Sequence, residues 1–194
     1  MTEIVLASAS PRRAELLASA GYRFTVRPAD VDETPRPDER PETCVVRLAR
    51  AKARAVATES GPDAVVLAAD TVVVAGDELL NKPVDRADAA RMLQKLSGTV
   101  HDVFTGVVVH AGTHELAEAV RTRVHFVPLR NLDIDWYINS GEPEGKAGAY
   151  AIQGRAARFI DRIEGSWSNV VGLPVATVHR LLSELARRGA IDPS

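Results

Sequence analysis

The segment Ala64-Val-Val-Leu-Ala-Ala-Asp-Thr-Val-Val-Val74 decides the fold of this chain, because it is apolar along its length apart from Asp70 and Thr71. Its length and its β-branched residues predict a buried strand. An ionised carboxylate in such a strand is strongly unfavourable unless a metal ion or cationic side chains compensate its charge. Asp70 is therefore a candidate functional residue before any other part of the chain is considered.

A turn is the alternative interpretation of this segment, since aspartate commonly ends a strand. Against it, Val72, Val73 and Val74 continue the β-branched pattern, and the obvious turn, Ala75-Gly-Asp-Glu78, comes only afterwards. The pattern favours a strand that leaves the core at Asp70, with the carboxylate facing a cleft.

Composition limits the class of protein. The 194 residues suit one compact domain or two small lobes, and a hydrophobic content of 45% is sufficient for a core. A net charge of -2 gives no general attraction to nucleic acids or acidic membranes. The single cysteine, Cys44, excludes an intrachain disulfide, and we expect it to pack in the core. Since no signal peptide or membrane-spanning run is visible, we expect a reducing, cytoplasmic setting.

Helical and strand patterns alternate along the chain, which predicts a mixed α/β class. Apolar periodicity and capping residues predict helices over 11–20, 41–59, 85–97, 133–139 and 174–188. Runs rich in β-branched residues predict strands over 4–7, 64–74, 100–110 and 116–127, of which the last two form a hairpin. Ser10 is the expected N-cap of the first helix and Asp85 that of the third.

The turn before the first helix, Ala7-Ser-Ala-Ser-Pro-Arg-Arg13, has the composition of an anion site. A helix N-terminus offers unpaired N–H groups, and the two arginines add permanent positive charge with bidentate geometry. The alternative is an ordinary capped helix with solvated arginines.

Lys52 lies in an unusual place, near the middle of an apolar helical stripe that includes Val45, Leu48 and Val56. The neighbouring arginines, Arg47, Arg50 and Arg54, are expected to point elsewhere. Two interpretations remain open: the lysine extends along its stem to water, or its ammonium group meets an anion in a cleft. Lys82, held in extended backbone before Pro83, is open to the same alternatives.

The five histidines show no spacing typical of a zinc site, because the pair His110 and His114 straddles Gly112 in a turn. By default Asp30, Asp32 and Glu33 are solvated loop residues. A hard cation held by Asp70 and Glu33, with phosphate oxygens and water, fits the available ligands better than a transition metal held by histidine.

Five motifs resemble those of the Maf and Maf-like nucleotide pyrophosphatases. They are Leu6-Ala-Ser-Ala-Ser-Pro-Arg-Arg13, Ala69-Asp-Thr-Val-Val73, Asn81-Lys-Pro-Val-Asp85, Gly145-Lys-Ala-Gly-Ala-Tyr-Ala-Ile-Gln-Gly154 and Gly165-Ser-Trp-Ser-Asn-Val-Val-Gly-Leu-Pro174. The resemblance implies a single domain over residues 1–194, with two lobes, a mixed sheet, flanking helices and a central cleft, similar to inosine triphosphate pyrophosphatases. It also implies hydrolysis of a nucleoside triphosphate to the monophosphate and pyrophosphate, with Mg²⁺ or Mn²⁺ as cofactor. A cytoplasmic homodimer is implied, with no nucleic-acid or membrane partner.

The same resemblance assigns roles to individual positions. Asp70 matches the catalytic acid, which helps to hold the metal and to activate water, and Glu33 matches its acidic partner. Substrate-binding residues are implied at Ser8, Arg12, Arg13, Lys52, Lys82, Thr71 and Gln153.

Specificity is implied by three of these positions. The branch of the family that acts on dTTP and UTP is similar in having arginine, threonine and glutamine where this chain has Arg12, Thr71 and Gln153. One departure is Ala151, where the family pattern has glycine; a requirement for positive φ there would shift the loop. Two alternatives remain: cleavage of 7-methyl-GTP, and a non-catalytic nucleotide-binding regulator of cell division.

Overall fold

The structure is a computed structural model that describes residues 4–61 and 63–192. Its elements are β1 (Ile4–Leu6), α1 (Pro11–Ser19), β2 (Phe24–Val26), α2 (Pro41–Ser60), β3 (Val65–Ala75), β4 (Glu78–Leu80), α3 (Arg86–Leu96), β5 (Val100–Ala111), β6 (His114–Phe126), α4 (Asn131–Ile138), the 3-10 turns η1 (Ala147–Ala149) and η2 (Arg155–Phe159), β7 (Ile160–Glu164), α5 (Trp167–Val171) and α6 (Val175–Arg187). The hydrogen-bonded strand order is β2-β1-β3-β5-β6-β7, with β4 paired to β3. The predicted mixed α/β class is confirmed.

The described residues form two compact units. The first comprises residues 4–61, 63–70, 105–120 and 172–192, and the second comprises residues 71–104 and 121–171. Strands β3, β5 and β6 contribute residues to both units. No helix among the described residues is long and apolar enough to cross a membrane.

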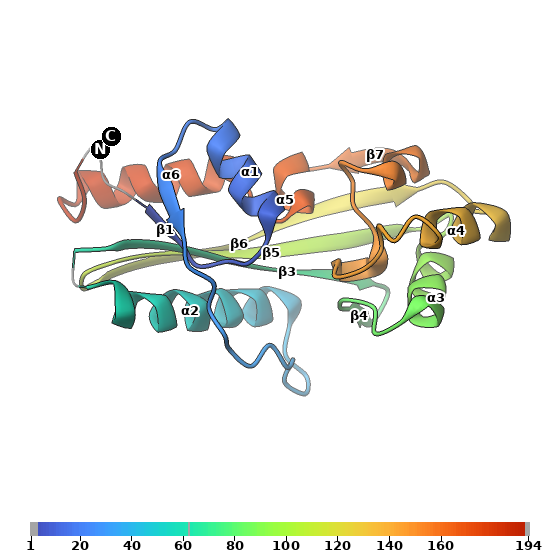
Figure 1. The fold of residues 1–194 in the computed structure, drawn as a ribbon, viewed down its shortest axis with the longest axis horizontal. Coiled ribbons are helices and arrows are strands. Elements are labelled where there is room, and N and C mark those ends of the chain that lie inside the picture. The colour runs from blue at the N-terminus through green and yellow to red at the C-terminus, as the bar shows by residue number, and fades with distance from the viewer. Residues whose placement is uncertain (1–3, 62, 193–194) are drawn as a thin grey trace. The chain divides into compact units, whose positions relative to one another are not determined.

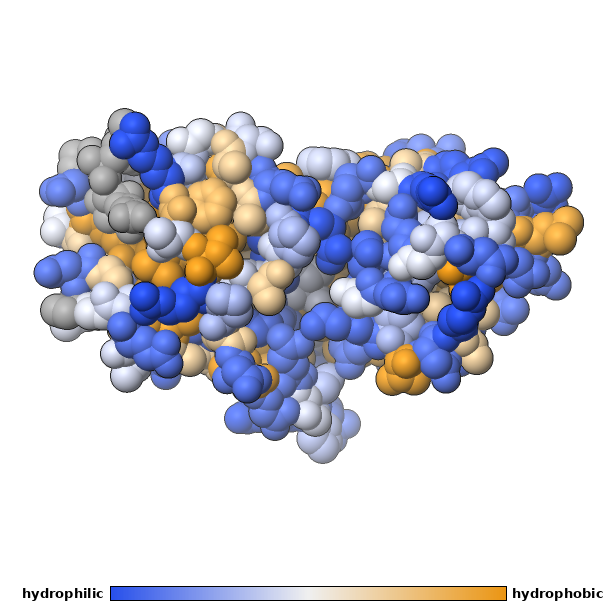
Figure 2. Space-filling view, viewed as in Figure 1, coloured by the Kyte–Doolittle hydropathy of each residue, from blue (hydrophilic) through white to orange (hydrophobic). Residues whose placement is uncertain are grey.

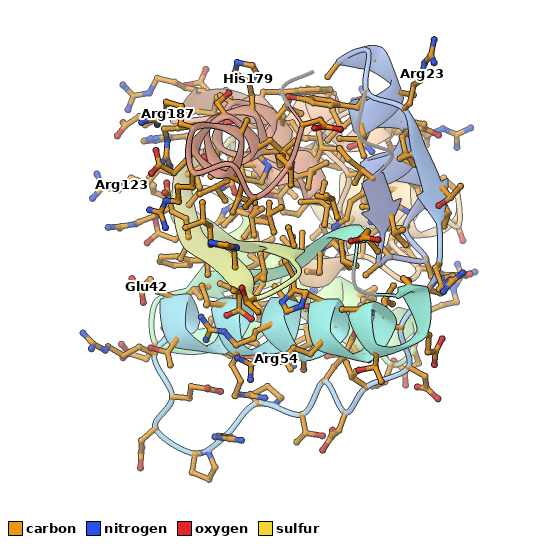
Figure 3. The ribbon with its side chains drawn as sticks, turned by 90° about the vertical axis from the view of Figure 1, so that its left-hand side faces the viewer. Arg23, Glu42, Arg54, Arg123, His179 and Arg187 are labelled. Carbon is orange, nitrogen blue, oxygen red and sulfur yellow. The ribbon has the colours of Figure 1, made fainter. Side chains whose placement is uncertain are left out.

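In the first unit, β1 pairs in parallel with β2 and with β3, with Leu6 opposite Leu67. Helix α2 covers one face of these strands, while α1 and α6 cover the other (Figure 1). The end-on view of Figure 3 shows the same layers, with Arg54 labelled on α2 and with His179 and Arg187 labelled on α6. The sheet is therefore buried on both faces, as the continuous apolar run in β3 predicts.

Successive residues of β3 point to opposite faces, and two separate cores result. Val65, Leu67 and Ala69 pack with Leu17 of α1 and with α6, in a core that also holds Val178, Leu181, Leu182 and Leu185. Val66 and Ala68 pack instead with Ala49, Ala53 and Val56 of α2. Because strand side chains alternate with a period of two, Asp70 falls on the α2 side with Val66 and Ala68.

A shallow pocket of about 270 Å³ lies in the first unit, lined in part by Ile4, Tyr22, Val65 and Leu182. Figure 2 shows hydrophobic side chains gathered on the visible face of this unit. Val65 precedes Asp70 by five strand residues, or roughly 16 Å. The pocket is therefore separate from the carboxylate that the sequence singles out.

The helix ends agree with the sequence signals in position. Asp85 is the N-cap of α3, and its carboxylate accepts a hydrogen bond from the N–H of Asp88 at 2.7 Å, as predicted. Ser10 is the N-cap of α1, but its side chain makes no capping hydrogen bond. Instead, the N–H of Ser10 donates to the hydroxyl of Ser8 at 3.2 Å, which keeps Ser8 close to the start of the helix.

The second unit has an aromatic core around His101. Rings of Phe126, Tyr150, Phe159 and Tyr137 pack edge to face or tilted against one another, with centroids 5.0 to 6.4 Å apart. His101 is 2% exposed and its Nε2 lies 2.8 Å from the Tyr150 hydroxyl, while its Nδ1 has no hydrogen-bond partner within the described part of the chain. Burial lowers the pKa of His101 to about 4, and the charge of Asp102 opposes this shift.

Close approach of α2 to the sheet depends on Gly106 of β5. A Cβ at this position would lie 2.4 Å from the backbone carbonyl carbon and oxygen of Val45.

We expect Gly106→Ala to lower the free energy of unfolding by about 3 kcal/mol, because neither backbone can yield. Gly76→Ala is the control, since a Cβ there meets nothing within 4 Å and only the positive φ of 61° is strained; its cost is about 1 kcal/mol. Urea unfolding measures both, and equal losses would contradict the close packing.

The buried His101 predicts a pH dependence of stability. A folded pKa of about 4, below the ordinary 6.5, means that the neutral form stabilises the fold above pH 6.5 and that this stability is lost as the pH falls toward 4. Between pH 7 and pH 5 the loss is about 2 kcal/mol. We expect His101→Gln to reduce this loss in denaturant titrations at the two pH values. An unchanged difference between pH 7 and pH 5 in the variant would contradict the assignment.

Candidate active site

Asp70 and Lys52 form a buried ion pair on the α2 side of the sheet. Oδ1 of Asp70 lies 2.6 Å from Nζ of Lys52, and the two residues are only 7% and 6% exposed. Strand β3 continues through Asp70 to Ala75, so the interpretation of Asp70 as the end of a strand is wrong. Lys52 does not extend to water, because its ammonium group meets an anion.

The helix places Lys52 there by its periodicity. The buried residues of α2 are Cys44, Val45, Leu48, Ala49, Lys52, Ala53 and Val56, which recur at helical spacing and face the sheet. Lys52 thus takes a core position one turn beyond Leu48, and its stem crosses apolar surface before its charged end reaches Asp70. Cys44 is buried, as predicted, and burial raises the pKa of its thiol to about 11.

Glu33 joins this pair from the loop that follows β2. Its Oε1 lies 2.6 Å from the same Nζ of Lys52, and its side chain is 43% exposed. Two carboxylates therefore share one ammonium group: Glu33 is an exposed loop residue, as the default interpretation has it, and it is also paired with Lys52. With two negative charges and one positive charge, the cluster carries a net charge of one negative unit.

The loop that carries Glu33 is fastened to α2 by Arg47. The guanidinium of Arg47 donates to both oxygens of Glu39, at 2.7 and 2.6 Å, and to the carbonyl of Thr34 at 3.3 Å. These hydrogen bonds lower the pKa of Glu39 to about 2. Asp32 accepts from the N–H of Thr34 at 2.9 Å and tightens the turn next to Glu33. As predicted, Arg47 points away from the site. Its hydrogen bonds hold the loop that carries Glu33.

Other arginines of α2 bind elsewhere, as predicted. Arg50 and Arg54 both reach Glu115 of β6, at 2.6 and 3.2 Å. No sequence signal distinguishes Arg47 from these two, because the partner of Arg47 lies in an irregular loop with no periodic pattern.

Ser8 lies in the turn after β1, next to the strand that carries Asp70, and Arg13 lies in the first turn of α1. Ser8 is buried, and its hydroxyl accepts from Nη1 of Arg13 at 3.2 Å. Nε of Arg13 donates to the carbonyl of Gly172 at 2.8 Å. Burial lowers the pKa of Arg13, while the negative charges of Asp70 and Glu33 oppose that shift. Arg13 therefore lies within the electrostatic reach of both carboxylates, and it remains a cation.

The remaining predicted substrate-binding residues differ in exposure. Arg12, in the first turn of α1, is partly buried, and so is Thr71, which follows Asp70 in β3. Lys82 is exposed in a bend after β4, and Gln153 is exposed in the loop before η2. Contact of these four with a substrate stays a prediction.

Ala151 is not strained. Among the described residues other than glycine, positive φ occurs only at Asp38 and Ala149, so the alanine at 151 needs no left-handed conformation. The left-handed position in this segment is Ala149, with φ of 59°. The loop therefore need not shift to accommodate alanine at position 151.

The carboxylates of Asp70 and Glu33 suit a divalent cation. They are hard oxygen ligands, and they already converge on one positive charge, the ammonium group of Lys52. No group of three or more histidine, cysteine, aspartate or glutamate residues that could hold a metal occurs in the described ranges. A cation held here would therefore take its remaining ligands from phosphate oxygens and water.

Arg47 provides a test of how the Glu33 loop is held. We expect Arg47→Met to speed cleavage after Glu33 by a glutamate-specific protease about tenfold, since the loop loses its fastening to α2 and opens more often. Arg50→Met is the matched control on the same helix, because its partner is Glu115. Mass spectrometry of early fragments measures the rates. Equal rates for the two variants would show that Arg47 does not hold the loop.

Comparison with known proteins places the chain in a family. The family model described as Maf-like protein matches residues 3–185. A Myxococcus xanthus protein named dTTP/UTP pyrophosphatase is 56% identical over 181 residues, which cover 93% of this chain and 91% of that protein. A Geotalea uraniireducens protein of the same name is 53% identical over 193 residues, which cover 98% and 97% of the two chains.

Solved structures show the same fold at much lower identity. A HAM1 protein from Coxiella burnetii matches with a TM-score of 0.54 and 17% identity, covering 95% of this chain and 100% of that one. The Ham1 protein of Staphylococcus aureus matches with a TM-score of 0.51 and 15% identity, covering 94% and 99%. At this identity the likeness concerns the fold alone, and it confirms the predicted fold class. From the family match and these relatives, we conclude that the chain belongs to the Maf-like family.

Proposed function

We propose that this chain hydrolyses dTTP and UTP to the nucleoside monophosphate and pyrophosphate, by attack of water on the α-phosphorus. The observation that carries the proposal is the cluster of Asp70, Lys52 and Glu33, in which a buried carboxylate and a second carboxylate both lie 2.6 Å from one ammonium group. The relatives at 53 and 56% identity are named dTTP/UTP pyrophosphatases, which supports the choice of substrate.

Asp70 is the proposed catalytic residue. Its carboxylate accepts a hydrogen bond from the attacking water, orients it and takes up its proton. Lys52 holds this carboxylate in place through the 2.6 Å contact, and the position of Asp70 within a strand fixes the direction of attack. Asp70 and Glu33 would hold a divalent cation, Mg²⁺ or Mn²⁺, which would supply positive charge to the α-phosphoryl group.

The cationic residues are proposed to bind the triphosphate and to stabilise the departing pyrophosphate. Arg13 is already oriented by Ser8 and by the carbonyl of Gly172, so little side-chain freedom is lost when it meets a phosphate. Arg12 and Lys82 are proposed to add further positive charge. These cationic groups are in place before the reaction, and they offset the negative charge that develops on the departing pyrophosphate.

Selectivity for the pyrimidine base is proposed to come from Arg12, Thr71 and Gln153. The amide of Gln153 both donates and accepts hydrogen bonds, so it can pair with the edge of uracil or thymine. Its exposed position leaves the amide open to a ligand. By the same family resemblance we propose a homodimer in the cytoplasm.

Pyrophosphate release from a panel of triphosphates tests the proposal. The panel holds dTTP, UTP, CTP, 7-methyl-GTP and ITP, each with Mg²⁺ or Mn²⁺ and each without metal. Preference for dTTP and UTP supports the proposed selectivity, while faster turnover of 7-methyl-GTP would replace it. Binding of nucleotide without any pyrophosphate release would favour the nucleotide-binding regulator and reject the enzyme.

Asp70→Asn isolates the charge of the proposed catalytic residue. The amide has nearly the same shape and retains an oxygen for Lys52, so we expect the variant to fold and to lose about 1000-fold or more in kcat. Asp102→Asn is the control, because Asp102 is also a strand carboxylate paired with an arginine, Arg121, at 2.7 Å. Pyrophosphate release and circular dichroism are measured for both. Near-normal turnover by folded Asp70→Asn would reject the assignment.

A further inference from the structure

In the second unit, the segment that carries Gln153 is bonded at both ends by the same pair of side chains. The pair consists of Tyr137, in α4, and Glu142, in the turns that follow α4. Neither residue belongs to the motifs on which the resemblance rests, and the proposed function assigns neither a role. Their hydrogen bonds surround the segment 151–156, in which Gln153 is exposed while Ala151 and Ile152 are each 7% exposed.

Tyr137 fixes the beginning of the segment. Its ring is fully buried, and its hydroxyl accepts a hydrogen bond from the N–H of Ala151 at 3.1 Å. The same hydroxyl donates to Oε1 of Glu142 at 2.8 Å. The hydroxyl accepts one hydrogen bond and donates the other, so it links the backbone of Ala151 to the carboxylate of Glu142.

Glu142 fixes the end of the segment. Its Oε2 accepts from the N–H of Arg155 at 3.0 Å, and its Oε1 also accepts from the N–H of Ala156 at 3.4 Å. These are the first two amides of η2. Gly154 allows the approach, because a Cβ at this position would lie 2.4 Å from Oε1 of Glu142.

Glu142 accepts three hydrogen bonds through its two carboxylate oxygens. Each donor is neutral, one hydroxyl and two backbone amides, and each needs an acceptor oxygen. A glutamine here would turn its NH₂ group toward one of these donors and break that contact. The arrangement therefore requires the carboxylate and is satisfied only while the segment keeps its shape.

We propose that Tyr137 and Glu142 are positioning residues that set the base selectivity of the enzyme by holding Gln153 in place. This inference rests on the proposed function. Backbone is fixed two residues before Gln153, at Ala151, and two residues after it, at Arg155. An amide discriminates between hydrogen-bonding edges of bases only when it is held in one position. The pair acts through Gln153 and does not touch the substrate.

Cytosine is the informative competitor. At its position 4 it presents an amino donor where uracil and thymine present a carbonyl acceptor. Selectivity is therefore measured as the ratio of kcat/KM for dTTP to that for dCTP. We expect this ratio to fall about tenfold in Tyr137→Phe, in Glu142→Gln and in Gln153→Ala. In Tyr137→Phe and Glu142→Gln, kcat for dTTP changes less than about threefold.

A double variant shows whether the pair acts through Gln153. If it does, Tyr137→Phe combined with Gln153→Ala lowers the ratio no further than Gln153→Ala alone. Additive losses would reject the route through Gln153. Tyr22→Phe is the matched control, since its hydroxyl bonds to Nδ1 of His179 at 3.0 Å in the first unit, and we expect it to leave the ratio unchanged.

Hydrogen exchange provides a readout that does not depend on catalysis. We expect the amides of Ala151 and Arg155 to exchange about tenfold faster in Tyr137→Phe than in the unaltered protein, and to be unchanged in Tyr22→Phe. Faster exchange with an unchanged ratio would reduce the pair to a structural role and overturn the proposal. Unchanged exchange in Tyr137→Phe would also overturn it.

Failure of the proposed function and failure of this inference give different results. If the unaltered protein releases no pyrophosphate from dTTP, the function and this inference are both rejected. If the unaltered protein prefers dTTP while Tyr137→Phe and Glu142→Gln keep the full ratio, only the inference is rejected. Should Glu142→Gln fail to fold, Tyr137→Phe decides alone, because it removes a single oxygen from a ring that stays in place.

Discussion

Nζ of Lys52 lies 2.6 Å from a carboxylate oxygen of Asp70 and 2.6 Å from one of Glu33, and much of the first unit is arranged around these contacts. Two of the three residues are buried, so each charge depends on the others for compensation. Strand β3 points Asp70 toward α2, and Gly106 allows α2 to approach closely enough for Lys52 to reach it. A divalent cation would change the net charge of the cluster from one negative to one positive unit, which suits a polyphosphate.

The sequence alone predicts the buried part of this site, because both residues there break a local rule. Asp70 interrupts a β-branched run, and Lys52 interrupts an apolar helical stripe, so each is visible without a partner in view. Glu33 breaks no rule, since acidic residues are ordinary in loops. It stands out only as an oxygen ligand for a cation at Asp70 and through the family resemblance. The fastening of its loop by Arg47 and Glu39 could not be predicted, because a contact between an irregular loop and a helix has no period along the chain.

The second unit shows the same division between regular and irregular structure. Strands β5 and β6 and helix α3 follow from alternation, periodicity and an N-cap, and their predicted bounds are confirmed within a few residues. The 3-10 turns η1 and η2 have no such pattern, so the hydrogen bonds that Tyr137 and Glu142 make to this region are visible only in the structure. Ala149 takes the left-handed conformation that the sequence pattern suggested for position 151. Regular elements thus position the proposed chemistry, while of the residues proposed to choose the base only Gln153 lies in an irregular segment.

In the proposed reaction, water attacks the α-phosphorus of a pyrimidine triphosphate. Hydrolysis of dTTP in water enriched in ¹⁸O tests it most directly, with the products separated and weighed by mass spectrometry. We expect dTMP that carries one ¹⁸O atom and pyrophosphate that carries none, because the bridging oxygen leaves with pyrophosphate. Label in pyrophosphate, or release of inorganic phosphate with dTDP, would contradict it.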